Sequence, residues 1–104
     1  MTYNEITAIV DLLAIKRVRQ SLRAINIPGI TVFRVKGYGK HKNFFRRGLM
    51  QQHSCLSVIA SEQQTDHIVQ TILDAAHTGL EGDGIVSVKP LSRFYSIYDK
   101  KQIQ

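Results

Sequence analysis

The sequence is short of several residue types, and each shortage excludes a class of protein. Its 104 residues include one cysteine, two prolines and no tryptophan. A single cysteine cannot form an internal disulfide, and small secreted domains usually contain several, so we expect a reducing, cytoplasmic environment. No apolar run approaches the roughly 18 residues of a membrane span, and residues 1–5 lack the character of a signal peptide. We therefore expect no insertion into a membrane.

Acidic residues are also scarce, but only in the first half of the chain. Residues 1–52 contain ten lysines and arginines and two acids, whereas residues 53–104 contain four cations and six acids. Within residues 34–47 there are six cations and no acid: Arg34, Lys36, Lys40, Lys42, Arg46 and Arg47. Such a stretch either binds an anionic partner or stays solvated because charge repulsion keeps it open.

Length and composition indicate one globular domain covering residues 1–104. The chain is 43% hydrophobic and 21% charged, which is ordinary for a folded domain and excludes a disordered tail or a fibrous repeat. A domain of this size buries only roughly 60–65% of its unfolded surface. Self-association would therefore add stability.

Hydrophobic periodicity predicts six regular elements. They are strands at 4–10, 30–35, 54–60 and 85–88 and amphipathic helices at 13–26 and 65–76. The order β-α-β-β-α-β predicts the α+β class with a ferredoxin-like sandwich. The first strand is apolar on both faces, which is typical of a central position in a sheet.

Local signals mark the ends of these elements. Asp11 is placed to cap the first helix, and Gly79 is placed to cap the C-terminus of the second. Residues 90–104 form a C-terminal tail after Pro90, in which 93–98 are predicted to be a short edge strand.

Residues 37–53 show no periodicity. The segment combines glycines, aromatic residues and cations. Loops of this length in a small domain are usually functional or disordered, so we expect a mobile loop that carries function.

The fold alone does not decide the function, because ferredoxin-like domains include RNA-binding modules, enzymes, metal carriers and regulators. Lys36–Gly39 matches the opening of an RNA-recognition signature, but Lys40 and His41 break the pattern that should follow. The first strand also lacks an aromatic residue for base stacking. Binding of nucleic acid is therefore disfavoured.

The sequence offers few groups for catalysis and slightly more for metal binding. Its acids are scattered and no nucleophile lies in an activating motif, so we do not expect an enzyme. His53 and Cys55 are two residues apart on one strand face, with His41 in the adjoining loop. These three residues could hold a soft cation, although a solvated histidine and a packed cysteine explain the same pattern.

Three segments in register carry a more specific signal. Residues 18–39 pass from a helix beginning Val-Arg into Gly-Ile-Thr-Val and then Val-Lys-Gly-Tyr-Gly. Residues 75–79 read Ala-Ala-His-Thr-Gly, and residues 82–84 read Gly-Asp-Gly. Together they resemble the P-II nitrogen regulatory protein family over nearly the whole chain.

The resemblance implies a homotrimer with nucleotide sites in the clefts between subunits. It also implies a loop, here 37–53, that contacts a regulated enzyme or membrane transporter. Members of the family sense ATP against ADP, often with 2-oxoglutarate. The cleft positions that match are Gly29, Thr31, Gly37, Gly39, Lys40, Gly82, Asp83 and Gly84.

The chain departs from the family pattern where phosphates are bound. Ile85 stands in place of a lysine, and Ser96 and Tyr98 stand in place of an Arg-x-Arg pair. His41 replaces a glutamine that helps to bind magnesium and 2-oxoglutarate. We therefore expect ADP or AMP as a possible ligand, with ATP and 2-oxoglutarate disfavoured, and no required cofactor.

The loop also departs from the pattern, because it is shorter and Phe45 stands in place of the tyrosine that is uridylylated in some members. Phe44 and Phe45, followed by Arg46 and Arg47, have the composition of an interface hot spot. The same residues could instead fold back onto the trimer. The sequence thus predicts a P-II-like regulator that docks this loop on a partner, with a metal or small-anion sensor and, less favoured, an RNA-binding module as alternatives.

Overall fold

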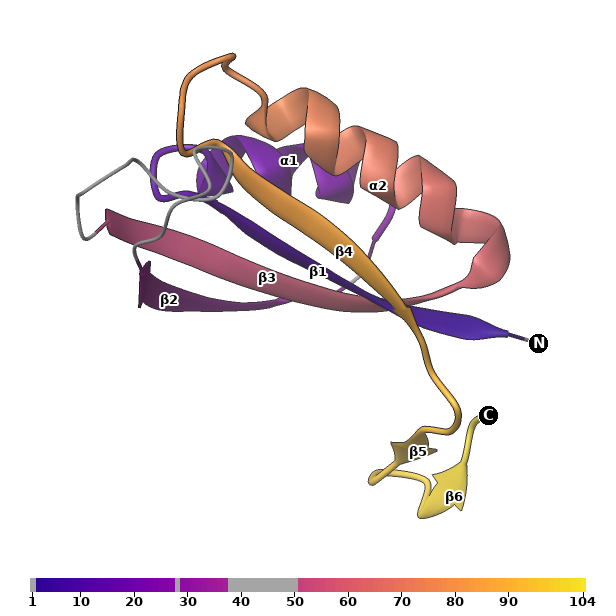
Figure 1. Cartoon of the computed structure of the whole chain (residues 1–104). Helices are drawn as coiled ribbons and strands as arrows, with labels where there is room; N and C mark the ends of the chain where they lie inside the picture. The colour runs from indigo at the N-terminus through magenta and orange to yellow at the C-terminus, as the bar shows by residue number, and fades with distance from the viewer. Residues whose placement is uncertain (1, 28, 38–50) are drawn as a thin grey trace.

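The computed structural model describes residues 2–27, 29–37 and 51–104. In chain order its main elements are β1 (Tyr3–Asp11), α1 (Ile15–Ala24), β2 (Thr31–Gly37), β3 (Gln51–Ser61), α2 (Glu62–Ala76) and β4 (Gly84–Pro90). The short strands β5 (Tyr95–Ser96) and β6 (Lys101–Gln102) follow. The predicted β-α-β-β-α-β order and the α+β class are confirmed (Figure 1).

The four long strands form one antiparallel sheet in the order β2-β3-β1-β4. Strand β1 is central, as its two apolar faces predicted, and Ile9 pairs with both Cys55 and Ile85. Both helices cover one face of this sheet (Figure 1), which we call the helix face. The opposite face, which carries Ile9, Cys55 and Ile85, is called the open face.

The core lies between the helix face and the two helices. Alternate residues of β1 point into it, and Ile6, Ala8 and Val10 are almost completely buried. Val18 and Leu22 of α1 and Ile68 and Ile72 of α2 pack against them. The Arg17 guanidinium also joins the helices, because its Nε donates to the carbonyl of Ala75 at 3.0 Å.

Buried polar residues fix the start of α2 on β1. The amide of Asn4, on the helix face of β1, donates hydrogen bonds to the carboxylate of Glu62 and, at 3.0 Å, to the hydroxyl of Thr65. Thr65 in turn donates to the carbonyl of Ser61 at 2.8 Å. These bonds place the first turn of α2 without a side-chain cap at Ser61.

Some boundaries differ from those that the sequence predicted. Strand β3 begins at Gln51 rather than at residue 54, because pairing with β1 and β2 extends the strand through the polar residues at its start. Helix α2 begins at Glu62 rather than at residue 65. Residues 51–53 and Gly37 therefore belong to strands, and residues 38–50 of the predicted loop lie outside the described residues. Gly79 does not cap α2, because the helix ends at Ala76 and Gly79 lies in the connection that follows.

The C-terminal tail forms a hairpin instead of an edge strand. Pro90 pairs with Asn4, near the start of β1, so residues beyond Pro90 run past the sheet and β5 pairs with β6. The base of the hairpin packs on Tyr3. The centroids of the Tyr3 and Phe94 rings are 4.9 Å apart, and the Tyr3 carbonyl accepts the Leu91 N–H at 3.0 Å. No helix among the described residues is long and apolar enough to span a bilayer.

Candidate ligand-binding site

The connection between α2 and β4, residues 77–83, is held in shape by hydrogen bonds to the carboxylate of Asp83. One carboxylate oxygen accepts the backbone N–H groups of Thr78 at 2.8 Å and Gly79 at 3.0 Å, and the other accepts the Thr78 hydroxyl. The N–H of Leu80 donates to the same hydroxyl oxygen at 3.2 Å. Backbone amides that would suit an external anion are thus bound by a carboxylate of the chain itself.

These contacts also set the protonation of Asp83. Partial burial would raise its pKa, but the hydrogen bonds from the Thr78 hydroxyl and from the Thr78 and Gly79 amides outweigh it, and the pKa lies below its ordinary value. The imidazole of His77, 3.8 Å away, acts in the same direction. Asp83 is therefore a fixed negative charge in this connection.

Two glycines allow the connection to enter β4. Gly84 has a φ of +111°, and a Cβ placed on it would lie 1.8 Å from the Ile9 carbonyl oxygen, so only glycine permits this approach to β1. Gly82 has a φ of +86°, and its carbonyl lies 3.1 Å from His53 Nε2. The Gly82–Gly84 turn is therefore held against both β1 and β3.

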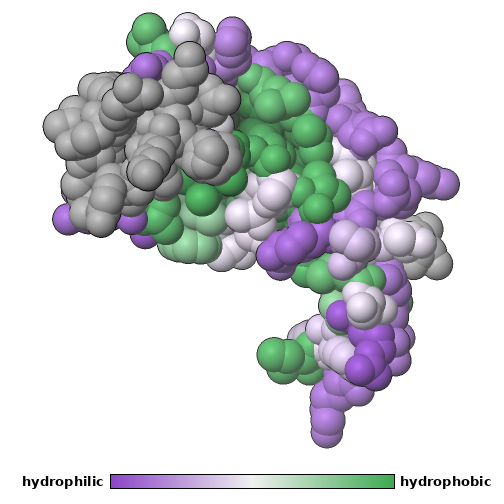
Figure 2. Space-filling model, viewed as in Figure 1, coloured by the Kyte–Doolittle hydropathy of each residue, from purple (hydrophilic) through white to green (hydrophobic). Residues whose placement is uncertain are grey.

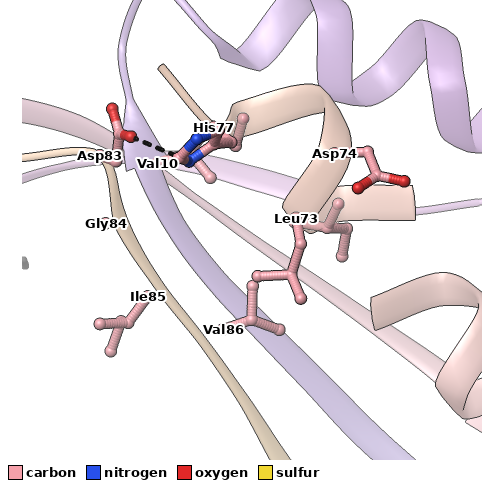
Figure 3. A pocket seen from close by; sticks show the side chains of 10 residues that line it. Val10, Leu73, Asp74, His77, Asp83, Gly84, Ile85 and Val86 are labelled. Carbon is pink, nitrogen blue, oxygen red and sulfur yellow. Dashed lines mark ion pairs between the residues drawn. The ribbon is translucent and has the colours of Figure 1, made fainter. Parts of the chain in front are cut away.

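A cavity of about 370 Å³ opens beside this turn, between the C-terminal end of α2 and the start of β4. Its walls are mainly apolar, and its lining residues are Val10, Ile72, Leu73, Asp74, Ala76, His77, Asp83, Gly84, Ile85 and Val86. Figure 3 shows the His77–Asp83 ion pair at one end and side chains from α2 and β4 around the same space. Ile85, which the sequence predicts to stand in place of a lysine that binds phosphate, lines this cavity.

The predicted nucleotide positions do not meet within one chain. Thr31 begins β2 at one edge of the sheet and Gly29 lies just before it, whereas Gly82–Gly84 lie at the other edge, beside β4. Strands β3 and β1 separate these edges, and adjacent strands lie about 4.8 Å apart. Within one chain the two groups therefore lie at opposite edges of the four-stranded sheet. Gly37 ends β2, and Gly39 and Lys40 lie outside the described residues.

Comparisons with known proteins identify the family. The model of the family described as Nitrogen regulatory protein P-II matches residues 3–101. The chain is 30% identical over 99 residues to Nitrogen regulatory protein GlnK of Escherichia coli K12, covering 88% of each protein. It is also 30% identical over 100 residues to Nitrogen regulatory protein P-II of Pasteurella multocida, covering 89% of each.

The chain belongs to the P-II family. Among solved structures, Arabidopsis thaliana PII bound to citrate superposes with a TM-score of 0.80 and 26% sequence identity, covering 96% of this chain and 84% of the other. P-II proteins are regulators that act as trimers on partner proteins rather than as catalysts. The resemblance drawn from the three motifs is confirmed.

The chain's departures from the P-II pattern have definite places in the fold. Ser96 and Tyr98, which the sequence predicts to stand in place of two arginines, belong to the C-terminal hairpin, where Tyr98 is exposed. Lys89 lies near the far end of β4 from this turn, and its ammonium is 3.5 Å from the carboxylate of Glu5.

The predicted metal ligands are only partly described. His53 and Cys55 share the open face of β3 and both are buried, and burial raises the pKa of the Cys55 thiol. Nε2 of His53 is bonded to the Gly82 carbonyl, and His41 lies outside the described residues. The described part of the chain contains no group of three side chains suited to a metal, so a site that includes His41 stays a prediction.

Sequence reasoning missed two features of this site. The sequence named Asp83 only as a matching cleft position, and it did not predict that its carboxylate accepts the Thr78 and Gly79 amides; the signal was the Thr-Gly pair four and five residues before it, since such amides are open to a nearby carboxylate. The apolar cavity had no sequence signal, because its walls come from β1, α2 and β4. Phe44, Phe45, Arg46 and Arg47 lie outside the described residues.

Proposed function

We propose that this P-II protein regulates a cytoplasmic or membrane-bound partner through residues 38–50 of the predicted loop and responds to ADP or AMP rather than to ATP. The observation that carries the nucleotide preference is the charge of the α2–β4 connection. Ile85 is apolar, and Asp83 adds a negative charge that already uses the amides of Thr78 and Gly79.

The preference follows from the number of phosphate charges. A charge-assisted hydrogen bond contributes about 1.5–3 kcal/mol, so a site that lacks three cations loses most where the ligand is most negative. A triphosphate loses all of these charge-assisted contacts, and it is also repelled by the carboxylate of Asp83. A mono- or diphosphate retains the contacts to the adenine and ribose with less repulsion.

Calorimetric titration with ATP, ADP and AMP tests this preference. We expect the unmodified protein to bind ATP no more tightly than ADP or AMP. The triple variant Ile85→Lys, Ser96→Arg and Tyr98→Arg should bind ATP at least tenfold more tightly, because each added cation restores a charge-assisted contact. His67→Lys adds a cation at an exposed position of α2, before the end of the helix that lines the cavity, and should change nothing.

Submicromolar binding of ATP by the unmodified protein, with a clear preference over ADP, would contradict this account. The same titration with Zn²⁺ examines the alternative of a metal sensor. Tight binding of Zn²⁺ that is lost in His41→Ala, together with no binding of any nucleotide, would replace the proposed ligand with a metal.

The partner-docking half of the proposal concerns Phe44 and Phe45. Two aromatic rings beside Arg46 and Arg47 supply an anchor and electrostatic steering, so partner affinity should fall with salt. Phe44→Ala with Phe45→Ala should leave the melting temperature within about one degree, since rings that serve a partner are not part of the core. A loss of several degrees would show that the rings stabilise the fold instead.

A further inference from the structure

Helix α1 contains four cations among its ten residues and no acid. Lys16, Arg17, Arg19 and Arg23 are all exposed, and the first two lie in the first turn, where the positive end of the helix dipole disfavours a cation. Arg19 and Arg23 are four residues apart, a spacing at which like charges on a helix repel each other. The charge pattern of α1 therefore lowers the stability of the helix in the protomer.

The acids of the chain do not offset this charge. All eight acidic residues lie within the described ranges. The two ion pairs among the described residues join Asp83 to His77, beside the turn before β4, and Glu5 to Lys89, between β1 and β4. The four cations of α1 therefore form no ion pair with an acid of their own chain.

Most of this charge is directed away from α2. Arg17 faces α2, because its Nε donates to the Ala75 carbonyl. Successive residues of a helix turn by about 100°, so Arg19 lies almost opposite Arg17, and Arg23 follows one turn later on the same side. Helix α2 lies over β1 and also contacts β3 and β4, and α1 packs beside it on the same face (Figure 1). The side of α1 that carries Arg19 and Arg23 is therefore directed toward the β2 edge of the sheet.

Strand β2 adds two cations on this side of the molecule. Val32 pairs with Leu56, which is buried beneath the helices, so Val32 and the alternate residues Arg34 and Lys36 share the helix face. Strand β2 is at the edge of the sheet, and these three side chains are exposed. The cations that α1 and β2 present on this side are called the basic face: Lys16, Arg19, Arg23, Arg34 and Lys36.

The β4 edge of the sheet has a different character. Hydrophobic residues gather on the surface over β4 and the neighbouring part of α2 (Figure 2). The carboxylates of Asp74 and Asp83 line the cavity at this edge. Charge is thus distributed unevenly across the sheet, and an anionic surface would attract the protein by its basic face and set its orientation.

The breadth and composition of the basic face suit a membrane surface better than a nucleic acid. A helix with its side chains is about 10–12 Å wide, and β2 lies next to α1, so the two together are too broad for a DNA major groove of about 12 Å. The face has no aromatic ring on which a base could stack, because Phe33 of β2 pairs with Cys55 on the open face. Val32, which is 40% exposed, instead adds an apolar side chain that suits the boundary between headgroups and acyl chains.

We propose that the basic face binds the surface of an anionic phospholipid membrane, without inserting a segment of the chain into the bilayer. Each Lys or Arg near such a surface strengthens binding about fivefold. Arg19, Arg23 and Arg34 present planar guanidinium groups, which bind phosphate oxygens in pairs. The inference goes beyond the proposed function, because it concerns lipid headgroups and neither the nucleotide nor the regulated partner.

Cosedimentation with protein-free vesicles tests the proposal, using the full chain without nucleotide. We expect binding to vesicles of phosphatidylcholine and phosphatidylglycerol in a ratio of about two to one, and binding about tenfold weaker or less to phosphatidylcholine alone. Arg19→Gln with Arg23→Gln, and Arg34→Gln with Lys36→Gln, should each weaken binding to the anionic vesicles by about tenfold or more. Both pairs are exposed, and the α1 pair should not lower the melting temperature, because it relieves the repulsion within the helix.

Two matched pairs serve as controls, and each removes the same charge. Arg93→Gln with Lys101→Gln removes two exposed cations of the C-terminal tail and should weaken binding by less than about threefold, since salt screens charges that lie away from the surface. Arg46→Gln with Arg47→Gln separates the basic face from the predicted docking loop, and it should weaken vesicle binding less than either pair of the basic face.

Four outcomes would overturn the proposal. They are equal binding to neutral and anionic vesicles, equal losses in the basic-face and tail variants, a loss that is largest in the Arg46 and Arg47 variant, and tighter binding to duplex DNA than to the anionic vesicles. The third would assign the membrane contact to the loop, and the fourth would assign the basic face to a nucleic acid. Nucleotide calorimetry tests the proposed function independently of all four.

Discussion

The two faces of the sheet are built from the same strands but differ in how far their apolar side chains are buried. On the helix face, Ile6 and Leu56 are completely buried beneath the helices. On the open face, Ile59 and Phe33 are about half exposed, at 45% and 51%. Strand alternation thus places Ile6 and Leu56 in the core and leaves Ile59 and Phe33 half exposed to solvent, although Cys55 on the same open face is buried. The open face suits a family whose members act as trimers.

A matched pair of substitutions, one on each face, should give the largest difference in stability. Ile6→Ala removes a completely buried side chain and should lower the free energy of unfolding by about 2–5 kcal/mol. Ile59→Ala removes the same atoms from the half-exposed side and should cost less than about 1 kcal/mol within one protomer. Urea denaturation of both variants at several protein concentrations provides the measurement.

The concentration series makes the result decisive for the open face. An effect of Ile59→Ala that grows with protein concentration and shrinks on dilution would mean that the open face stabilises the assembly rather than the protomer. Equal, concentration-independent losses in the two variants would mean that both faces are core, contrary to the exposed fractions.

The next largest effect concerns the backbone at the two sheet edges. Gly84→Ala, at the β4 edge, places a methyl group against the Ile9 carbonyl at a φ of +111° and should cost about 2 kcal/mol or more, because the strand must move to relieve the contact. Gly29→Ala, before β2, meets no atom within 4 Å and should be neutral or stabilise by up to about 1 kcal/mol. Melting temperatures of the two variants compare them directly; a Gly84→Ala protein as stable as wild type would exclude the required close approach.

Most of the fold was predictable because its signals are local. Alternation in β1 and the three- and four-residue steps of Val18 and Leu22 identify the faces that pack, and these do not depend on distant residues. The start of β3 at Gln51 and the hairpin at residues 95–102 were not predictable, because both are set by pairing. Gln51 pairs with Gly37, and the residues after Pro90 have no neighbouring strand left to join.

The site was less predictable than the fold, for the same reason. The motif at Gly82–Gly84 indicates a tight turn from its residue types alone. The role of Asp83 depends on where the amides of Thr78 and Gly79 lie. Their position is set by the end of α2 at Ala76, which is earlier than the end expected for a helix capped by Gly79. A sequence pattern therefore identifies the residues of a site more readily than the hydrogen-bond partners of their side chains.

The smallest predicted effect is the pH dependence of this connection. Asp83 has a pKa below the ordinary value of 3.8, so its ionised form stabilises the folded state. This contribution is complete above that ordinary value and is lost as the pH falls through the lower pKa of the folded protein. Asp83→Asn should therefore reduce the free energy of unfolding by about 1–2 kcal/mol at neutral pH, and the difference from wild type should shrink below about pH 4.

Chemical denaturation at a series of pH values from neutral to acid measures this difference. Asp66→Asn is the matched control, because Asp66 is an exposed carboxylate on the neighbouring helix α2 and its loss should give a small difference at every pH. A difference between Asp83→Asn and wild type that stays constant, or grows, as the pH falls would show that the carboxylate does not hold the Thr78 and Gly79 amides. The connection would then be free to offer those amides to an anionic ligand.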